Sequence, residues 1–599
     1  MLGNINKDLL PIKTHYFLFN AATGPIVPFL PTVAKQLGFS SLLVGTIYTI
    51  LPISGLVAKP LFGILADKFR LHKTFFIVFQ IIVALSFFSI NIIPEIENSA
   101  NATLNCKNFR HVSAVFLSIC SKHGFSESTL GNVLTDAPHT AQCQLSCQKT
   151  QNTNNELCKN WHIQEFCTNS TDSFTSNTFN FRASFDISND IKVKNCVYLH
   201  IRNATFSDKT AHIPECESFL HTSCLAKCHN NLAFNQLLRE ADQVHKDPMV
   251  KVTSTYQFHV FLWAAIISWI GMAVVVVIAD AICFGILGEE RRKEYGKQKM
   301  WGSIGFGIFG IAAGYLVDLF SGNDSQKDYT CIFYIMLIAM ICDILVSSRL
   351  KKKDTTYSDI DPSLLLEIIG LIKKGSVLVF IWWCIGAGMC TAVVWNFLFW
   401  YTDDLAKSSD LTVKWIKTLQ GLLTGVQCFL GELPFNFISG AVLRKLGHVN
   451  VMSIVLIVYA VRFMAYSVVS NVWIFLLLEI LHGPSLGLCW PTMVSYGDKV
   501  TPAGTKSTVQ GLIGGVFEGI GVSCGSLICG WLMNTYGGII AFRIFSAGAL
   551  IWLSLFWLFQ LLLRKTKAYP IHHGHNHLAS YANPDEAIIM TMSQEMETY

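Results

Sequence analysis

Ionisable side chains inside long apolar runs are the residues of this sequence best suited to chemistry. A charge is costly in hydrocarbon, so an ionisable residue in a membrane helix is typical of an ion, proton or solute pathway. Six charged residues and one histidine fit this description: Lys59, Asp280, Glu432, Arg462, Glu479, Glu518 and His482. They predict a polar interior in an otherwise apolar protein.

Glu479 and His482 are three residues apart, which places both side chains on one face of a helix. A carboxylate beside an imidazole, within reach of Arg462, can exchange a proton when the surrounding helices rearrange. We therefore expect Arg462, Glu479 and His482 to couple transport to protons. The alternative is that Arg462 and Glu479 form an ion pair that only locks two helices together.

Depth in the membrane separates these residues. With a rise of about 1.5 Å per residue, four fall nearer mid-membrane than either surface: Glu432, Arg462, Glu479 and Glu518. Asp280 falls nearer the cytoplasmic side. Asn20, Trp395 and Asn396 supply polar anchors and an aromatic wall for a solute pocket, whereas Trp400 is expected in the interfacial aromatic belt.

Twelve apolar runs, each long enough to cross about 30 Å of hydrocarbon, must position these side chains. They lie near residues 15–34, 41–65, 74–94, 257–283, 301–320, 331–348, 376–401, 412–442, 449–468, 472–495, 508–533 and 541–563. With 51% hydrophobic and 14% charged residues, the sequence predicts an all-α polytopic membrane protein with twelve transmembrane helices in two six-helix halves. The net charge of +5 is too small and scattered for a nucleic-acid partner.

Lys and Arg in the short connections predict the orientation. They gather after every second span, as at Lys68, Arg291 and Lys351, and at both ends of the chain. We therefore expect cytoplasmic termini in a protein of the plasma membrane. The first run, 16–33, carries three prolines and is interpreted as a retained helix, not a cleavable signal.

The polar segment 95–256 interrupts the apolar runs and falls on the outer side. It contains ten cysteines: Cys106, Cys120, Cys143, Cys147, Cys158, Cys167, Cys196, Cys216, Cys224 and Cys228. An even number of cysteines outside the cell favours an extracellular loop joined by disulfides. Zinc binding by Cys143 and Cys147, or by Cys224 and Cys228, is the alternative.

Other segments outside the helices carry weaker signals. N-glycosylation sequences begin at Asn101, Asn169, Asn203 and Asn323, all in loops predicted outside. Residues 349–375 form a cytoplasmic linker between halves, and 564–599 form a cytoplasmic tail. The histidines of His572–His577 in the tail either bind zinc or are simply solvated, and we expect no metal site or cofactor.

The stretch Pro60-Leu-Phe-Gly-Ile-Leu-Ala-Asp-Lys-Phe-Arg-Leu-His-Lys73 separates the second and third spans. Gly63 and Asp67 share a helix face, where the glycine would admit a close helix and the carboxylate would meet a helix N-terminus. With Lys68, this pattern resembles the signature loop of the major facilitator superfamily. The alternative is a basic run that only sets topology. Residues 439–448 repeat the pattern weakly in the second half.

Three further segments resemble the oligosaccharide/proton symporter branch, to which lactose permease belongs: Lys293-Glu-Tyr-Gly-Lys-Gln-Lys-Met-Trp-Gly-Ser-Ile-Gly305, Gly431-Glu-Leu and Leu481-His. The resemblance implies that Glu432 contacts solute, that Arg462 and His482 belong to a proton-coupling group, and that Asp280 lies beside a sugar-binding position. The segment Leu481-His-Gly and the cysteine-rich loop also resemble the animal carriers called major facilitator superfamily domain-containing protein six.

Departures from the symporter pattern argue against lactose. Lys299 stands where a sugar-clamping guanidinium is expected, and Phe306 replaces a tryptophan. Ser485 occupies the place of a protonated glutamate, which leaves Glu479 as the substitute. Lys59 and Glu518 reverse the polarity expected there, so we predict that they form an ion pair.

The sequence therefore predicts a secondary active transporter, not an enzyme, that moves a small polar solute by alternating access with protons. No G-x-x-x-x-G-K-[ST] phosphate loop occurs, which argues against an ATP-driven pump. The alternative is a cell-surface receptor or interaction protein whose disulfide-bonded loop binds an extracellular protein ligand.

Overall fold

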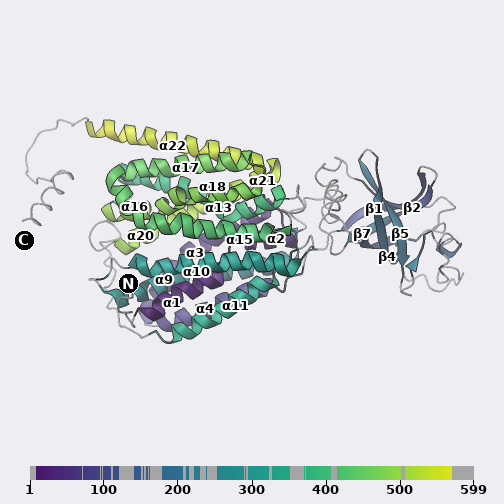
Figure 1. Ribbon diagram of the computed structural model, residues 1–599, viewed down its shortest axis with the longest axis horizontal. Helices are drawn as coiled ribbons and strands as arrows, with labels where there is room; N and C mark the ends of the chain where they lie inside the picture. Colours follow the sequence, from purple (N-terminus) through teal and green to yellow (C-terminus); the bar gives the residue numbers. More distant parts are fainter. Residues whose placement is uncertain are drawn as a thin grey trace, which may run out of the picture.

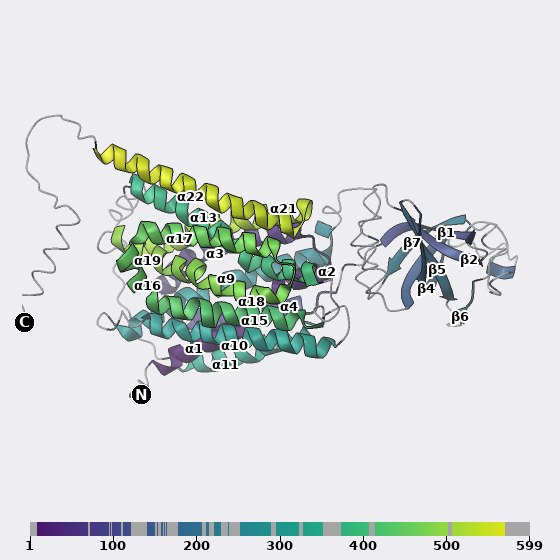
Figure 2. The ribbon, with the colours of Figure 1, turned by 45° about the horizontal axis from the view of Figure 1, so that its top comes forward.

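A bundle of long helices lies side by side, and a small strand domain projects from one end of it (Figure 1). The computed structural model describes residues 9–69, 72–94, 96, 99–109, 112–120, 140–149, 153, 157–159, 161, 163, 178–193, 195–206, 211–214, 221–228, 238, 252–288, 291, 295–322, 327–350, 370, 373–406, 414–500 and 506–568. The first helix begins, and the last helix ends, at the end of the bundle away from the strands (Figure 2).

Eleven helices within the described residues are long and apolar enough to cross a membrane. Those of the first half are α3 (Ser41–Phe69), α4 (His72–Ile90), α9 (Tyr256–Leu287), α10 (Tyr295–Ser321) and α11 (Thr330–Ser348). Those of the second half begin with α13 (Gly375–Ala406), include α17 (His448–Val468) and end with α22 (Gly538–Ala568). Each overlaps the apolar run predicted for it.

Three spans of the second half are built from several segments. The span Ile416–Leu446 contains α15 (Ile416–Val426), the π-helix η3 (Gln427–Glu432) and α16 (Leu433–Leu446). The span Val472–Val500 contains η4 (Val472–Ile474), α18 (Phe475–Leu478), η5 (Glu479–Leu481), the π-helix η6 (Gly483–Gly487) and α19 (Leu488–Val500). The last of the three joins α20 (Lys506–Gly515), the π-helix η7 (Val516–Val522) and α21 (Ser523–Tyr536).

The predicted first span, 15–34, is not one helix, so the expectation of twelve continuous helices is corrected. It comprises α1 (Leu10–Thr23) and α2 (Leu30–Leu37), joined by a turn. Pro25 and Pro28 lack the N–H that an α-helix needs. The turn keeps local hydrogen bonds, such as Val27 N to Thr23 O at 2.9 Å. The chain therefore continues in the same direction without a regular helix.

The two halves approach most closely where glycines face each other. A Cβ added to Gly314 of α10 would lie 2.1 Å from Lys417 O and 3.0 Å from Gly421 Cα of α15. On the second crossing, a Cβ on Gly45 of α3 would lie 2.6 Å from Ser526 O and 3.0 Å from Gly530 Cα of α21. Small residues let membrane helices pack backbone to backbone, and here they join one half to the other.

The strand domain replaces the predicted extracellular loop with a folded antiparallel sheet. Its strands are β1 (Ser99–Phe109), β2 (Val112–Cys120), β3 (Thr140–Gln148), β4 (Thr178–Val193), β5 (Cys196–Thr205), β6 (Ala211–His212) and β7 (His221–Cys228). Their order is β2-β1-β7-β3-β4-β5-β6, and β2 also pairs with β5. Six strands thus close into a ring with few free edges, around a core that includes Trp161 and Phe181.

Two disulfides join residues that face each other on neighbouring strands. Cys120 bonds Cys196 across β2 and β5, and Cys147 bonds Cys224 across β3 and β7. The first of them ties the strand pair that closes the ring. The disulfide to Cys224 also argues against the zinc alternative for that cysteine, and Cys106, Cys143 and Cys158 are disulfide-bonded as well.

Other predicted features of the loops are only partly covered. Asn101 is exposed on β1 and Asn203 is half-buried on β5, whereas Asn169 and Asn323 lie outside the described residues. The tail histidines and almost all of the linker 349–375 also lie outside them.

Candidate functional site

A buried polar network in the second half brings together the three residues predicted for proton coupling. Arg462 of α17 donates from Nη2 to Glu479 Oε2 and from Nη1 to His482 Nδ1 at 3.2 Å. Tyr466 donates its hydroxyl to Glu479 and accepts from Arg462 Nε at 2.6 Å. Arg462 and Glu479 are 0% exposed and His482 is 2% exposed, so water does not compete for these bonds.

Arg462 determines which ring nitrogen of a neutral His482 carries the proton. A guanidinium only donates hydrogen bonds, so Nδ1 of His482 must accept, and a neutral His482 carries its proton on Nε2. That nitrogen faces Glu432 Oε1 at 3.7 Å. Glu432 in turn accepts a hydrogen bond at 3.1 Å from Ser303 of α10, in the other half. The network therefore reaches the interface between halves.

The distorted helix segments hold several of these side chains. Glu432 ends the π-helix η3, Glu518 lies in η7, and His482 directly precedes η6. Gln427, at the start of η3, donates to Glu479 Oε2 at 2.8 Å. A π-helical turn adds a residue to the helix and redirects its side chains, and such turns are frequent at functional sites.

A second polar cluster lies in the first half and contains Asp280 and Lys299. Asp280 of α9 accepts from Tyr16 OH of α1 at 2.8 Å and from Lys299 Nζ of α10 at 3.3 Å. Lys299 also donates to Tyr295 OH at 3.0 Å. Asn20 of α1 lies beside it, where its Nδ2 bonds Tyr16 O at 2.9 Å.

α10 connects the two clusters. Lys299 and Ser303 are four residues apart and share one helix face. Lys299 reaches Asp280 in its own half, and Ser303 reaches Glu432 in the other half. The side chains of Lys299, Asp280 and Glu432 are 44%, 23% and 31% exposed, whereas the Arg462 network is buried.

The predicted ion pair between the halves is present. Lys59 Nζ of α3 lies 2.8 Å from Glu518 Oε2 of η7. Both side chains are about one-third exposed, at 35% and 32%. The pair therefore forms at a junction that solvent still reaches.

The signature-loop residues Gly63, Asp67 and Lys68 only partly follow the sequence predictions. A Cβ added to Gly63 would meet nothing within 4 Å, so the expectation that Gly63 admits a close helix is wrong in this conformation. The physical reason is that α4 packs against Phe62, whose ring lies 4.8 Å from that of Phe79, while the Gly63 face meets no other described residue. Lys68 is exposed, and the side chain of Asp67 lies outside the described residues.

The two pocket residues expected on α13 differ in their exposure. Trp395 is 41% exposed, whereas Asn396 is 6% exposed and donates from Nδ2 to Ser526 Oγ of α21 at 2.8 Å. In this conformation Asn396 thus joins α13 to α21. Trp400 is buried, with Lys35 Nζ 4.8 Å from its ring centre.

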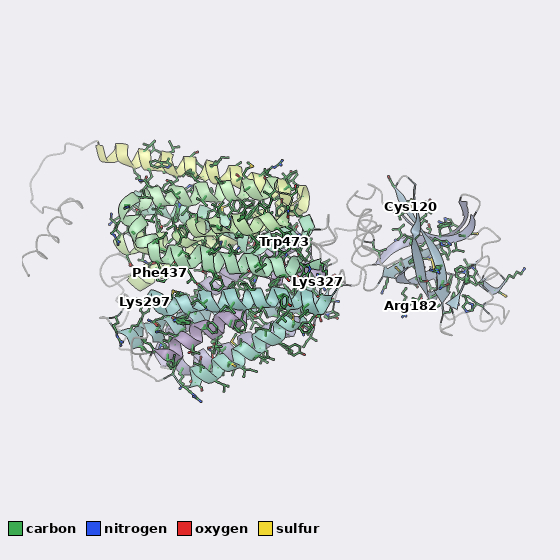
Figure 3. The ribbon with its side chains drawn as sticks, in the orientation of Figure 1. Cys120, Arg182, Lys297, Lys327, Phe437 and Trp473 are labelled. Atoms are coloured by element: carbon green, nitrogen blue, oxygen red, sulfur yellow. A yellow bond between two sulfur atoms is a disulfide. The ribbon has the colours of Figure 1, made fainter. Side chains whose placement is uncertain are left out.

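A polar seal at the strand-domain end escaped the sequence predictions. Asp318 of α10 accepts at 2.6 Å from the backbone N–H of Thr418, in the first turn of α15 of the other half. Lys327 lies 3.1 Å from Asp318 and donates to Lys414 O at 3.1 Å. Lys327 lies at the end of the bundle next to the strands, as Figure 3 shows. The signal was available, because Asp318 is an acid inside an apolar run.

Two more ion pairs surround this seal. Lys35 of α2 pairs with Asp404 of α13 at 2.8 Å and so joins the halves. Lys417 of α15 pairs with Asp403 at 2.8 Å, and Gln420 donates to the same carboxylate at 2.7 Å. The helix ends next to the strand domain are therefore closed by direct contacts between the halves. Within the described residues, no group of three or more His, Cys, Asp or Glu is placed to hold a metal ion.

Two groups of helices that meet along glycine-lined crossings, with a polar interior between them, define a transporter of the major facilitator superfamily. A model of the MFS_1 like family matches residues 9–544, and the chain belongs to that family. The family model covers both polar clusters and the seal.

Individual relatives are distant. The chain is 24% identical to a maltose permease of Geobacillus stearothermophilus over 295 residues, 48% of this chain and 68% of the permease. It is 25% identical to a major facilitator superfamily domain-containing protein 6-like of Mus musculus over 275 residues, 45% of this chain and 44% of that protein. The matched part thus spans less than half of the mouse relative.

A solved structure shares the fold. The crystal structure of the nucleoside transporter NupG aligns with a TM-score of 0.54 at 12% sequence identity, covering 92% of this chain and 99% of that chain. A mutant form of the same transporter gives a TM-score of 0.55 at 13% identity over the same shares. At this identity the likeness concerns the fold alone.

Proposed function

We propose that this protein is a secondary active transporter that moves a small polar solute by alternating access, coupled to a proton. The observation that carries the proposal is the contact chain from buried Arg462 through His482 to the partly exposed Glu432. The imidazole of His482 stands in the middle of these contacts, and the Glu432 end reaches the interface between the halves. The printed name of one relative, a maltose permease, supports a small polar solute.

Protonation of His482 would redirect this contact chain. A proton on Nδ1 removes the lone pair that accepts from Arg462, so that hydrogen bond is lost. The imidazolium is then attracted to Glu432, whose carboxylate already lies 3.7 Å from Nε2. Because Glu432 also bonds Ser303 of the other half, proton binding changes a contact between the halves. Solute that competes for Glu432 would be coupled to the proton in the same way.

Alternating access follows from the asymmetry between the two ends. The seal around Asp318 and Lys327 is buried, whereas Lys59 and Glu518 are about one-third exposed. We place the strand domain outside the plasma membrane and both termini in the cytoplasm, with α1 and α2 together crossing the membrane as the twelfth span. This conformation is then closed to the outside. Lys59, Glu518 and the Gly63–Lys68 segment are proposed to meet more tightly in the opposite state.

A solute screen tests the proposal. Purified full-length protein is heated with single sugars, nucleosides, amino acids and amines at two pH values on either side of histidine titration. A stabilising solute is then added to proteoliposomes that contain a pH-sensitive dye. We expect the solute to drive a pH change that Glu432→Gln and His482→Gln abolish, while Asn436→Gln, on the following helix, leaves it intact. A pH-independent solute flux in wild type would contradict proton coupling.

A further inference from the structure

Another buried ionisable pair lies in the first half, next to the cluster that contains Asp280. His15 of α1 contacts both carboxylate oxygens of Asp343 of α11, with Nδ1 at 2.8 Å from Oδ1 and 3.0 Å from Oδ2. Gln80 of α4 donates to Asp343 Oδ2 at 2.9 Å and to Ser347 Oγ at 3.0 Å. All four side chains are at most 1% exposed.

The charges of His15 and Asp343 indicate that this cluster holds one additional proton. A neutral His15 would leave the Asp343 carboxylate as an isolated buried charge, which is costly in a membrane protein. One additional proton on His15 makes the pair net neutral while Nδ1–H still donates to Asp343. Among the described residues, none donates a hydrogen bond to Gln80 Oε1, so the amide is oriented to donate to the carboxylate at the expense of its own acceptor.

No other charged group within the described residues contacts the pair. α1 supplies the rings of Tyr16 and Phe19 near His15, and α4 supplies Phe76, whose ring centre is 4.7 Å away. Tyr16, which is adjacent to His15 in sequence, bonds Asp280 of α9. Toward the chain ends, Lys73 of α4 bonds the carbonyl of Ser348 at 2.5 Å.

We propose that His15 and Asp343 form a proton-binding site that joins α1 to α11. His15 is five residues from the start of α1, and Asp343 is five residues from the end of α11. At about 1.5 Å per residue, each lies within two turns of the end that carries the chain termini. A proton reaches the site from that side when α1 and α11 separate.

The site also positions the solute cluster. His15 and the adjacent Tyr16 point to different partners, Asp343 on α11 and Asp280 on α9. Binding or loss of the proton shifts α1 and thereby moves Tyr16 relative to Asp280. His15 is a positioning residue in this respect. The site does not depend on coupling through His482, because the two pairs lie in different halves.

Thermal unfolding across pH tests for the proton. Full-length protein in nanodiscs is compared with the double variant His15→Gln/Asp343→Asn, which keeps hydrogen bonding but cannot titrate. An unfolded histidine loses its proton near about pH 6.5. If the folded pair keeps its proton above that pH, the folded state binds more protons, and its stability falls as pH rises. The Tm advantage of wild type is then expected to shrink by about 1 °C per pH unit.

Whether the Tm advantage of wild type falls or grows with pH decides between a protonated and a neutral His15. A Tm advantage that grows with pH would mean a neutral His15 and would overturn the proposal, and so would a constant advantage. His448→Gln, which alters a half-buried histidine of the second half bonded to Ser495, should leave the trend in place. If the double variant does not fold, Gln80→Met carries the test. Loss of the amide leaves His15 as the main donor to Asp343. The pH range over which Tm declines should therefore move to higher pH. An unchanged range would refute the site.

Discussion

Lys59 and Glu518 are 459 residues apart in sequence, and their charged atoms lie 2.8 Å apart between the two halves. Because both are about one-third exposed, the pair contributes at most about 1 kcal/mol. Lys59→Met or Glu518→Gln should lower Tm by about 1 °C or less. The swap Lys59→Glu/Glu518→Lys should restore most of the loss, as measured by thermal unfolding in nanodiscs.

The control for this charge swap is Lys445→Met, a change of an exposed lysine of α16 near the same end. It should leave Tm unchanged. If the swap is no more stable than the two single changes combined, the contact has no energetic role in this conformation.

Arg462 and Glu479 allow the two interpretations of the buried network to be separated. Removing one partner leaves an uncompensated buried charge, so Arg462→Met and Glu479→Met should each destabilise by about 3–5 kcal/mol. The double change to methionine removes both charges and should recover stability. We expect it to remain unable to couple a solute to proton movement in the dye-loaded proteoliposomes. If the double variant recovers both stability and proton coupling, Arg462 and Glu479 only hold two helices together.

Much of the helical frame could be predicted from the sequence, because a membrane span is a local property of about twenty consecutive residues. The pair of Lys59 and Glu518 was also predictable, since two opposite charges inside apolar runs reverse the polarity of the resembled family. Gly63 was not, because close packing at a glycine depends on which neighbour approaches in a given conformation. The broken first span reflects Pro25 and Pro28, which hydropathy alone does not weigh.

Long-range contacts were the main omission. Cysteine spacing indicated disulfides but not strands, since closing the ring requires β2 to meet β5 across a gap of 76 residues between Cys120 and Cys196. His15 and Asp343, and Asp318, were ionisable residues inside apolar runs, so the signal for them existed. Their partners come from other helices, and helix order in space cannot be read from periodicity.

Gly314 should be far more sensitive to enlargement than Gly63. A Cβ at Gly314 would lie 2.1 Å from a carbonyl oxygen of α15, whereas a Cβ at Gly63 meets nothing within 4 Å. Gly314→Ala must therefore push α10 and α15 apart, at a cost of about 1–3 kcal/mol, and lower Tm. Gly63→Ala is the matched control and should leave Tm unchanged or slightly raised. Equal effects at both sites would mean that this helix crossing is not adopted in solution.

The Cys120–Cys196 disulfide should stabilise the strand pair that closes the ring. It closes a loop with a sequence separation of 76, for which chain entropy gives about 4 kcal/mol. Cys120→Ser/Cys196→Ser should open the β2–β5 pairing, with faster proteolysis of residues 99–228 on intact cells. Cys524→Ser, at an exposed free cysteine, is the control. Unchanged proteolysis in the double variant would show that strand pairing alone holds the ring.

Asp318 should control opening at the strand-domain end, because its carboxylate caps α15 of the other half through Thr418 N–H and is paired with Lys327. Asp318→Ala removes both contacts, whereas Asp318→Asn keeps an acceptor for the N–H and loses only the charge. If the closed conformation loses about 1–2 kcal/mol of stability, the population of the open conformation rises about 5- to 30-fold.

The opening is measured by labelling Thr424→Cys with a membrane-impermeant maleimide. Thr424 is 1% exposed and packs against Gly310. We expect labelling to increase from wild type through Asn to Ala, with Asp498→Asn at the opposite end as the control. Identical labelling rates in all three proteins would contradict a gating role for this cap.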